Sequence, residues 1–306
     1  MNGRYFLTIC LNPTLQKTIV LNRLWENEVN RSDEYYLDAS GKGINVTRVL
    51  NQLGEEVIHL TQAGGSNREL FLSFVKKDNL TCSWVESEAE IRFCYTLLNK
   101  EKHTTTEIIE EAETVGKETE TKIYQEYLRL LPESHTVIIS GTKAPGFSNE
   151  LYPEMVKSAK ENGKIVILDL KGEDLKNSLK YRPDIIKPNV SEFIDTFING
   201  FSVSENELEE EALNAVRHKM IEIHQQFGII SVLTKGKYGT FFYENGAVRN
   251  LPAEMIEPVN TIGCGDAFTA GFASLWIREK NITDAIKKGM KCAKLNALSL
   301  HPGVIK

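Results

Sequence analysis

Short runs of apolar residues alternate, over most of the chain, with longer segments in which apolar residues recur every three or four positions. The short runs are typical of buried strands, and the wider spacing is typical of amphipathic helices. The pattern predicts strands at 4–10, 57–60, 136–140, 165–168, 185–186 and 229–233. It predicts helices at 44–53, 69–76, 122–131, 151–161 and 192–197, and a long helix along the apolar steps from Leu208 to Phe227. This alternation favours βαβ units, and therefore an α/β fold whose largely parallel sheet is covered on both faces.

Two stretches depart from this alternation. Residues 17–37 and 92–109 carry alternating and β-branched residues without a helix between them. They predict a small β lid that stands apart from the main sheet and is formed by segments near 14–38 and 90–110. Residues 238–243 and 247–251, joined around Asn245-Gly246, predict a hairpin. The sequence has no internal repeat and no low-complexity linker, so we expect one domain, 1–306, with a small β appendage.

Composition and charge narrow the class of protein. The chain has 306 residues, 41% hydrophobic and 25% charged, which is ordinary for a soluble globular protein. The net charge is −6 without a dominant basic stripe, so nucleic acid is not an expected partner. The acidic segment 205–211 is explained by a helix start, because Ser204 and Glu207 have capping-box spacing. No apolar run is long enough to span a membrane, and the N-terminus passes directly into strand-like sequence without a signal core, so we expect a cytoplasmic protein.

Cysteines and histidines give no sign of a disulfide framework or a metal site. The five cysteines include no CxxC pair, and the six histidines show no HExxH or HxH spacing. Cys264 lies at a predicted helix start, where a thiol pKa can be lowered. A catalytic thiol is nevertheless not favoured, because no histidine lies nearby in sequence.

The most informative motif runs from Gly263 to Ala267. Gly263 and Gly265 frame Cys264, Asp266 follows, and an apolar, helix-periodic run begins at once. Glycines allow backbone N–H groups to turn toward a common point, and a helix N-terminus adds positive partial charge there. The motif therefore predicts an anion cradle beside a carboxylate suited to taking a proton from a hydroxyl that attacks phosphorus. Alone, it is equally consistent with a glycine turn that opens a helix, with Asp266 as an ordinary first-turn acid.

A second glycine motif, Gly41-Lys42-Gly43, also precedes a predicted helix. The glycines allow close approach of a ligand, Lys42 supplies a positive charge, and Asn45 can donate and accept hydrogen bonds. The motif is not a Walker A loop, and the first motif is not a dinucleotide fingerprint, so a plain turn with a solvated lysine is the alternative. Because ligands gather at the carboxyl ends of parallel strands, the two motifs could face one cleft, one side holding a donor phosphate and the other the acceptor.

Two weaker motifs follow predicted strands in the second half of the chain. Asn189 and Glu192 lie three apart at a helix start and share a face, and one carboxylate with one amide suffices for Mg²⁺, which keeps several waters. The alternative is a helix with Asn189 as its N-cap. Thr234, Gly236 and Gly239 could line the base or phosphates of a nucleotide, although glycines at a strand end more often mark a hairpin.

In this combination the chain resembles, from end to end, the ribokinase/phosphofructokinase-B family of sugar kinases. The matching motifs, in order, are Leu11-Asn12-Pro13, Val29-Asn30-Arg31, Gly41-Lys42-Gly43-Ile44-Asn45-Val46 with Arg48-Val49-Leu50, Ser140-Gly141 through Pro145-Gly146, Lys187-Pro188-Asn189 with Glu192, and Gly263-x-Gly265-Asp266-Ala267-Phe268. The first and third are most similar to the phosphosugar branch, 1-phosphofructokinase and tagatose-6-phosphate kinase. The resemblance implies a ribokinase-like three-layer α/β/α sandwich with a mostly parallel sheet, ATP and Mg²⁺ as cofactors, a sugar phosphate as acceptor, and a homodimer through the β lid.

The resemblance also implies roles for single residues. Asp266 matches the catalytic base, and Gly263, Cys264 and Gly265 match the loop whose amides form the anion hole. Asn189 and Glu192 match the Asn-x-x-Glu motif that organises Mg²⁺ and phosphate. The positions matched to the acceptor sugar are Gln16, Arg31, Gly41, Lys42, Gly43, Asn45 and Arg92, of which Arg92 resembles the arginine that faces the sugar's existing phosphate. The positions matched to the cofactor side are Lys187, Asn189, Thr234, Gly236, Gly239 and Asn296.

Departures from the family pattern all lie on the acceptor side of this assignment. Gln16 stands where Asp is usual, Ser40 where Gly is usual, and Cys94 where the phosphosugar branch usually has Asn, and Thr142-Lys143-Ala144 replaces a small, proline-rich stretch. A carboxylate accepts hydrogen bonds from two sugar hydroxyls, whereas an amide offers one acceptor oxygen and an NH₂ donor. Such a change of hydrogen-bond partner can alter specificity by orders of magnitude.

The sequence thus predicts an ATP- and Mg²⁺-dependent kinase that phosphorylates an alcohol group of a small phosphosugar, of the fructose 1-phosphate or tagatose 6-phosphate type. Lys42 and Arg92 favour a phosphate-bearing acceptor. Two alternatives stay open. One is a kinase of an unphosphorylated sugar or nucleoside. The other is a catalytically silent sugar- or nucleotide-sensing protein on the same fold, for which Gln16 is the best support and Asp266 the strongest opposition.

Overall fold

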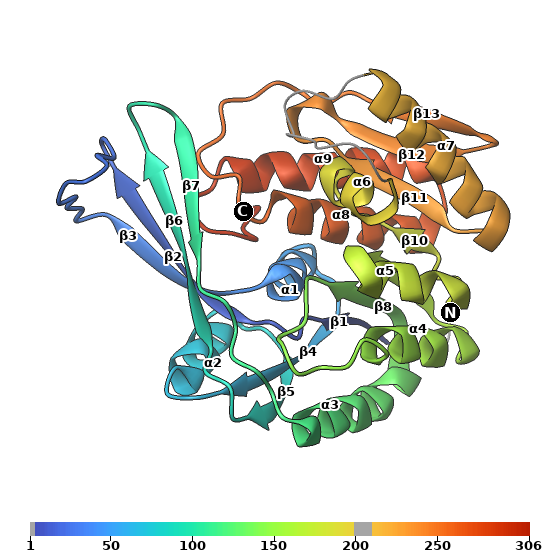
Figure 1. Ribbon diagram of the computed structural model, residues 1–306, viewed down its shortest axis with the longest axis horizontal. Coiled ribbons are helices and arrows are strands. Elements are labelled where there is room, and N and C mark those ends of the chain that lie inside the picture. The colour runs from blue at the N-terminus through green and yellow to red at the C-terminus, as the bar shows by residue number, and fades with distance from the viewer. Residues whose placement is uncertain (1–3, 199–209) are drawn as a thin grey trace.

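The larger of two sheets forms the centre of the molecule (Figure 1). The computed structural model describes residues 4–198 and 210–306. Nine strands within these ranges pair in the order β13-β12-β11-β10-β9-β8-β1-β4-β5. All neighbours from β11 to β5 are parallel, whereas β12 pairs antiparallel with β11 and with β13. The strands are β1 (Tyr5–Ile9), β4 (Val57–Gly64), β5 (Cys82–Ser87), β8 (Ser134–Ser140), β9 (Ile165–Asp169), β10 (Ile185–Ile186), β11 (Ile230–Thr234), β12 (Thr240–Glu244) and β13 (Ala247–Leu251).

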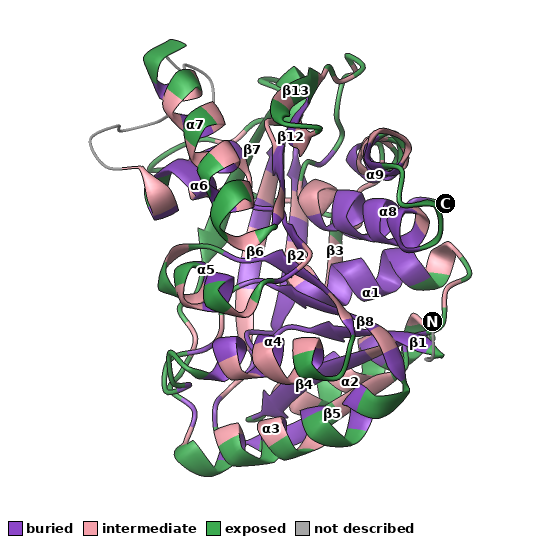
Figure 2. Cartoon of the chain, turned by 90° about the vertical axis from the view of Figure 1, so that its right-hand side faces the viewer, coloured by how far each residue is buried: buried purple, intermediate pink, exposed green. Residues whose placement is uncertain are grey.

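Helices cover both faces of this sheet (Figure 2). Alternate side chains of β8 belong to two separate apolar clusters, Val137 and Ile139 to one and Ile138 to the other, as the two-residue period of a strand requires. The first cluster contains residues of α3 (Lys117–Leu130), α4 (Leu151–Glu161), α5 (Gly172–Ser178), α6 (Val190–Phe197) and α7 (Glu210–Phe227). The second contains residues of α1 (Lys42–Gln52), α8 (Cys264–Glu279) and α9 (Ile282–Ala297). The result is the three-layer α/β/α sandwich that the sequence predicted.

A second, four-stranded sheet projects from one side of the sandwich (Figure 1). Its order is β3-β2-β6-β7, with β2 (Thr14–Leu21), β3 (Tyr35–Ser40), β6 (Arg92–Asn99) and β7 (Thr104–Ile109). Strands β2 and β6 pair in parallel, and β3 and β7 flank them antiparallel. Its base packs on α2 (Arg68–Lys77) through a third apolar cluster that includes Leu15 and Phe71. We call it the small sheet; its strands overlap the segments 14–38 and 90–110, in which we expected strands apart from the main sheet.

Several elements differ from the predicted pattern. The hairpin around Asn245-Gly246 is confirmed as β12 and β13. Three elements were not predicted. Strand β5 lies at the edge of the main sheet and alternates buried and exposed positions only weakly, and helix α5 has only seven residues. The amphipathic helix α9 was also not predicted. The long helix is confirmed from Glu210 onward, and the predicted capping residues Ser204 and Glu207, with Leu208, lie outside the described residues. None of the helices in the described ranges is both long and apolar enough to cross a membrane.

Candidate active site

The carboxyl ends of the parallel strands open into a large pocket of about 1940 Å³. Cys10 follows β1, Gly141 follows β8, and Asp169 ends β9, and all three line it. The small sheet lines the opposite side through residues of β2, β6 and β7. The sequence-predicted site residues that line the pocket are Gln16, Gly41, Lys42, Asn45, Arg92, Lys187, Asn189, Glu192, Thr234, Gly236, Gly239, Gly263, Cys264, Gly265 and Asp266. Motifs from both ends of the chain therefore meet in one cleft, as expected for an open α/β sheet.

The start of α8 forms a cradle of backbone N–H groups. Gly263 precedes the helix with φ of 80°, a left-handed conformation that residues with a Cβ rarely adopt. The N–H groups of Gly265 and Asp266 find no acceptor within 4–198 and 210–306, as expected for the first turn of a helix. Such orphan donors, together with the positive end of the helix dipole, form an anion-binding site.

Asp266 lies in the first turn of α8 with only 6% of its surface exposed. Its Oδ2 accepts a hydrogen bond of 2.8 Å from Asn45 Nδ2. Burial is the main reason that the pKa of Asp266 rises to about 6, and the negative charge of Asp169 adds to the rise, whereas Lys42, the Asn45 bond and Lys187 oppose it. A carboxylate with a pKa in this range is ionised near neutral pH and still binds a proton readily, which suits a general base.

Lys42 and Lys187 share the charge of Asp169. Lys42 Nζ lies 3.5 Å from Asp169 Oδ1 and 3.1 Å from Glu192 Oε1, and Lys187 Nζ lies 3.2 Å from Asp169 Oδ2. Burial alone would raise the pKa of Asp169, but the two ammonium groups outweigh it and lower that pKa. Burial likewise opposes the charge of Lys42, and the carboxylates overcome it and raise its pKa. Lys42 therefore pairs with two carboxylates, although its side chain keeps 39% of its surface exposed.

Asn189 and Glu192 form a capping box at the start of α6. Asn189 Oδ1 accepts from the Glu192 N–H at 2.7 Å, and Glu192 Oε2 accepts from the Asn189 N–H at 3.0 Å. Asn189 is thus the N-cap of α6, which was the structural alternative for this motif, and both residues also line the pocket. In the part of the chain that the structure describes, no three His, Cys, Asp or Glu side chains are placed to enclose a metal ion. Glu192, whose two oxygens already accept hydrogen bonds, fits a Mg²⁺ ion that keeps its waters and binds nucleotide phosphates, and does not fit an all-protein cage.

On the acceptor side, three polar side chains have bonding capacity left over. Gln16 Nε2 donates to Thr96 Oγ1 at 2.8 Å, and its carboxamide oxygen has no partner among the described residues. Asn12 Nδ2 donates to Thr142 Oγ1 at 3.3 Å, while its buried Oδ1 has no partner in the described ranges. The buried Nε of Arg92 is also unpartnered there. All three residues line the pocket, and because buried polar atoms in proteins are nearly always bonded, they are candidates for contact with a polar ligand.

Three predicted site residues do not line the pocket. Arg31 is exposed in the connection between β2 and β3. Gly43 packs α1 against β1, because a Cβ there would lie 2.7 Å from Cys10 Cβ. Asn296 is fully buried; its Nδ2 donates to the Ile262 carbonyl at 2.8 Å and its Oδ1 accepts from the Gly303 N–H at 2.6 Å. Asn296 therefore holds the loop that leads into α8 and, in this structure, presents no surface to a nucleotide.

Two lining residues differ from expectation in their physical state. Burial raises the pKa of the Cys264 thiol to about 11, against the lowering expected at a helix start, so the thiol is protonated at neutral pH. Gly239 lines the pocket, yet its left-handed φ of 99° and its contact with the Leu251 carbonyl also make it a packing residue of the hairpin.

Sequence reasoning missed Asp169 and Asn12 as site residues. Asp169 directly follows the apolar residues of a correctly predicted strand, where charged residues of parallel sheets gather, so its position was a usable signal. Asn12 lies within a motif that had been noted for its similarity to sugar kinases. Arg48 also lies within a motif that had been noted for its similarity to sugar kinases, but the match assigned it no role.

Known proteins resemble this chain in both sequence and fold. Residues 12–303 match the pfkB family carbohydrate kinase model. Tagatose-6-phosphate kinase from Staphylococcus epidermidis is 30% identical over 301 residues, 98% of this chain and 94% of that enzyme. Phosphofructokinase-2 from Escherichia coli in complex with fructose-6-phosphate shares the fold, with a TM-score of 0.84, 18% identity and coverage of 98% of this chain and 95% of that one. The tetrameric inhibited form of that enzyme matches with a TM-score of 0.81 and 18% identity, covering 96% and 94%. The chain therefore belongs to the pfkB family of carbohydrate kinases, which use ATP.

Proposed function

We propose that this protein is a Mg²⁺-dependent phosphosugar kinase that transfers a phosphoryl group from ATP to an alcohol of a tagatose 6-phosphate or fructose 1-phosphate type of substrate. The observation that carries the proposal is the placement of the Asp266 carboxylate beside the unpartnered N–H groups of Gly265 and Asp266 in one pocket. The carboxylate takes the proton of the attacking hydroxyl. The N–H groups stabilise charge on the transferred phosphoryl group, which is the larger contribution in most such enzymes.

The donor side of the proposal rests on Lys187, Asn189 and Glu192. Lys187 is 2% exposed and lies close to Gly265, with Nζ 3.9 Å from where a Cβ would stand. Its ammonium can therefore accompany a phosphate seated at the helix start. Glu192 and Asn189 would hold Mg²⁺ through its waters, and the ion would neutralise charge on the nucleotide. Thr234, which pairs with Asn189 in a β-bridge, and Gly236 also line the pocket and would contact the nucleotide itself.

The acceptor side rests on Asn12, Gln16 and Arg92. The free amide oxygens of Asn12 and Gln16 accept hydrogen bonds from sugar hydroxyls, and Arg92 binds the phosphate that the sugar already carries. The charge of Lys42 is weaker support for a phosphate-bearing acceptor than the sequence suggested, because its ammonium is already paired with Asp169 and Glu192. That pairing keeps a kinase of an unphosphorylated sugar as the second candidate.

A coupled ADP-release assay with matched sugars tests the proposal. Tagatose 6-phosphate, fructose 1-phosphate and fructose 6-phosphate are each compared with the sugar that lacks the phosphate. One charged arginine–phosphate contact predicts about a 10- to 100-fold preference in kcat/KM for the phosphorylated partner. Equal kcat/KM for both members of each pair favours the second candidate. Binding of ATP and sugar without any turnover would make the protein a sensor and overturn the proposal.

We further propose that the small sheet joins two copies of the chain. Trp25, Val29, Tyr35 and Ile108 on this sheet and its connection are each at least half exposed. An exposed apolar group of this kind is typical of an interface. Sedimentation should give the mass of a dimer, and Ile108→Lys should shift the protein toward a monomer. A monomeric wild-type protein at micromolar concentration would contradict the proposal.

A further inference from the structure

Asn45 contacts Asp266 directly, and the orientation of its amide is fixed from the opposite side. Its Nδ2 donates to Asp266 Oδ2 at 2.8 Å, while its Oδ1 accepts from Arg48 Nη1 at 3.0 Å and from Ser40 Oγ at 3.2 Å. If the amide turned by 180°, its oxygen would face the carboxylate and its NH₂ would face the guanidinium, and both contacts would be repulsive. Arg48, which can only donate, therefore determines which end of the amide Asp266 meets, and the Ser40 hydroxyl adds a second hydrogen bond to the same oxygen.

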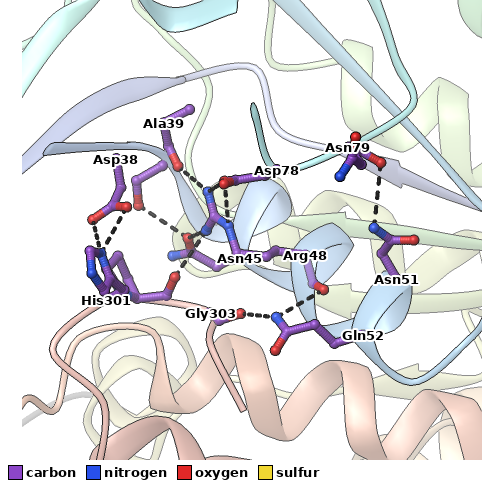
Figure 3. Close-up of polar contacts among 12 residues, drawn as sticks. Asp38, Ala39, Asn45, Arg48, Asn51, Gln52, Asp78, Asn79, His301 and Gly303 are labelled. Atoms are coloured by element: carbon purple, nitrogen blue, oxygen red, sulfur yellow. Dashed lines mark hydrogen bonds and ion pairs between the residues drawn. The ribbon is translucent and has the colours of Figure 1, made fainter. Parts of the chain in front are cut away.

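Arg48 is itself held rigidly (Figure 3). It is 5% exposed, and each of its three nitrogens donates a hydrogen bond to another element. Nε donates to Asp78 Oδ2 at 2.9 Å, Nη1 to the Pro302 carbonyl at 2.9 Å, and Nη2 to the Ala39 carbonyl at 2.5 Å. The guanidinium group of Arg48 thus links the end of α2, the chain after α9 and the small sheet. A lysine cannot reproduce this planar set of donors.

The segment after α9 that carries Pro302 is fixed by neighbouring contacts. Gln52 Nε2 donates to the Gly303 carbonyl at 2.7 Å, and Gln52 Oε1 accepts from the Ile305 N–H at 2.9 Å. A Cβ on Gly303 would lie 3.1 Å from both Arg48 Nη1 and Asn45 Cα, so a glycine is needed for this approach. The Pro302 carbonyl is therefore a fixed acceptor, and Arg48 has little freedom to move away from Asn45.

We propose that Arg48, with Ser40 as a second donor, is a positioning residue for phosphoryl transfer that holds the Asn45 amide so that its NH₂ faces the Asp266 carboxylate. This inference rests on the proposed function, because it takes Asp266 as the base. Arg48 acts through Asn45 and touches no reacting atom. Its role in the reaction is to keep the base ionised and aimed.

The acid limb of the pH–rate profile reports this role. The groups that face Asp266 are Asp169 at the end of β9, Lys42 on α1, Lys187 after β10, and the thiols Cys10 and Cys264. None of them is changed by a substitution at Arg48 or Ser40. The Asn45 bond favours the ionised carboxylate, so its loss raises the pKa of Asp266, and activity is then lost at a higher pH on acidification.

The test uses Arg48→Met, Arg48→Lys and Ser40→Ala, with Gln52→Leu as the control. Arg48→Met should lower kcat by about 10- to 100-fold with little change in the KM for ATP, and move the acid limb of kcat upward by about one to two pH units. Arg48→Lys and Ser40→Ala should shift it in the same direction by less. Gln52→Leu weakens the same segment from the next turn of α1 without touching Asn45, so it should lower the thermal midpoint and leave the acid limb in place.

Two results would overturn the inference. One is a folded Arg48→Met that keeps both the kcat and the acid limb of the wild type. The other is a Gln52→Leu that shifts the limb as far as Arg48→Met does. If Arg48→Met does not fold, Arg48→Lys and Ser40→Ala carry the test, and an unmoved limb in both is equally decisive. Carboxyl NMR titration, with the Asp266 signal assigned by its loss in Asp266→Asn, reads the same pKa without turnover, so failure of the proposed function is distinguished from failure of this inference.

Discussion

Replacing the Asp266 carboxylate by an amide of the same shape should abolish most activity and, at alkaline pH, stabilise the protein. Asp266→Asn removes the proton acceptor, so kcat should fall by about 10²- to 10⁴-fold, or roughly 3–5 kcal/mol in the barrier. The N–H groups of Gly265 and of residue 266 remain, and the affinity for ATP should change little. The substitution thus separates the chemical role of the side chain from its effect on folding.

The gain in stability follows from the pKa of Asp266. Burial raises this pKa from 3.8 to about 6, and a difference of about two units corresponds to roughly 3 kcal/mol as an upper bound. Because the folded-state pKa is the higher one, the ionised carboxylate opposes folding fully above pH 6. This penalty shrinks as the pH falls from 6 to 3.8 and is absent below. Asp266→Asn should therefore raise the thermal midpoint at pH 8 by up to about 4 °C, and the gain should vanish near pH 4.

Thermal unfolding at pH 8 and pH 4 and coupled ADP release at pH 8 measure the two effects. Asp169→Asn is the matched control, because the pKa of Asp169 is lowered by Lys187 and Lys42. Its loss should destabilise the protein at pH 8, the opposite sign. Turnover by Asp266→Asn equal to that of the wild type would refute its assignment as the base. Lost turnover with an unchanged midpoint at pH 8 would refute the argument from burial.

Two further substitutions test the packing around the site. Gly43→Ala places a Cβ 2.7 Å from Cys10 Cβ. This overpacking should lower the free energy of unfolding by about 1–3 kcal/mol and, by displacing α1, should lower kcat. A stable variant with full activity would show that the start of α1 tolerates the extra methyl group. His301 Nδ1 lies 3.0 Å from the Asp38 carboxylate, and this hydrogen bond is the main reason that the pKa of His301 is raised. A raised histidine pKa stabilises the fold below about pH 6.5, and the effect is lost as the pH rises through the folded value. His301→Gln should thus lower the thermal midpoint at pH 6 more than at pH 9. The difference in stability should be less than about 1 kcal/mol, because the ring is partly exposed. An equal loss at both pH values would contradict the ion pair.

Local pattern was enough to predict the buried strands of the main sheet. The buried parallel strands are continuous apolar runs, and the helices that cover them carry a single apolar face, so both signals were strong. Strand β5 is half exposed at an edge, and its alternation was too weak to detect. Strand β4 continues through the buried polar residues Thr61 and Gln62, whose burial depends on neighbours and not on their own type.

For the site, strand ends and glycine turns were enough to predict which segments meet, but not which side chains pair. The convergence of the two glycine motifs follows from topology, because every parallel strand ends at the same edge of the sheet. The partner of each charge does not follow, since it depends on packing between distant segments. Lys42 pairs with Glu192, 150 positions away, and Asn45 with Asp266, 221 positions away. For the same reason the sequence does not reveal that Asn296 donates to the Ile262 carbonyl and accepts from the Gly303 N–H.

The charges around Asp266 bear on the Mg²⁺ dependence that we propose. Next to Asp266, the carboxylates of Asp169 and Glu192 are paired with the ammonium groups of Lys42 and Lys187. Asp169 already raises the pKa of Asp266, and the phosphates of ATP, seated at the start of α8, would raise it further. With no cation to offset them, Asp266 would bind a proton more readily once the donor is bound. Under the proposed function, a divalent cation bound with the nucleotide would offset this charge and help to keep Asp266 ionised.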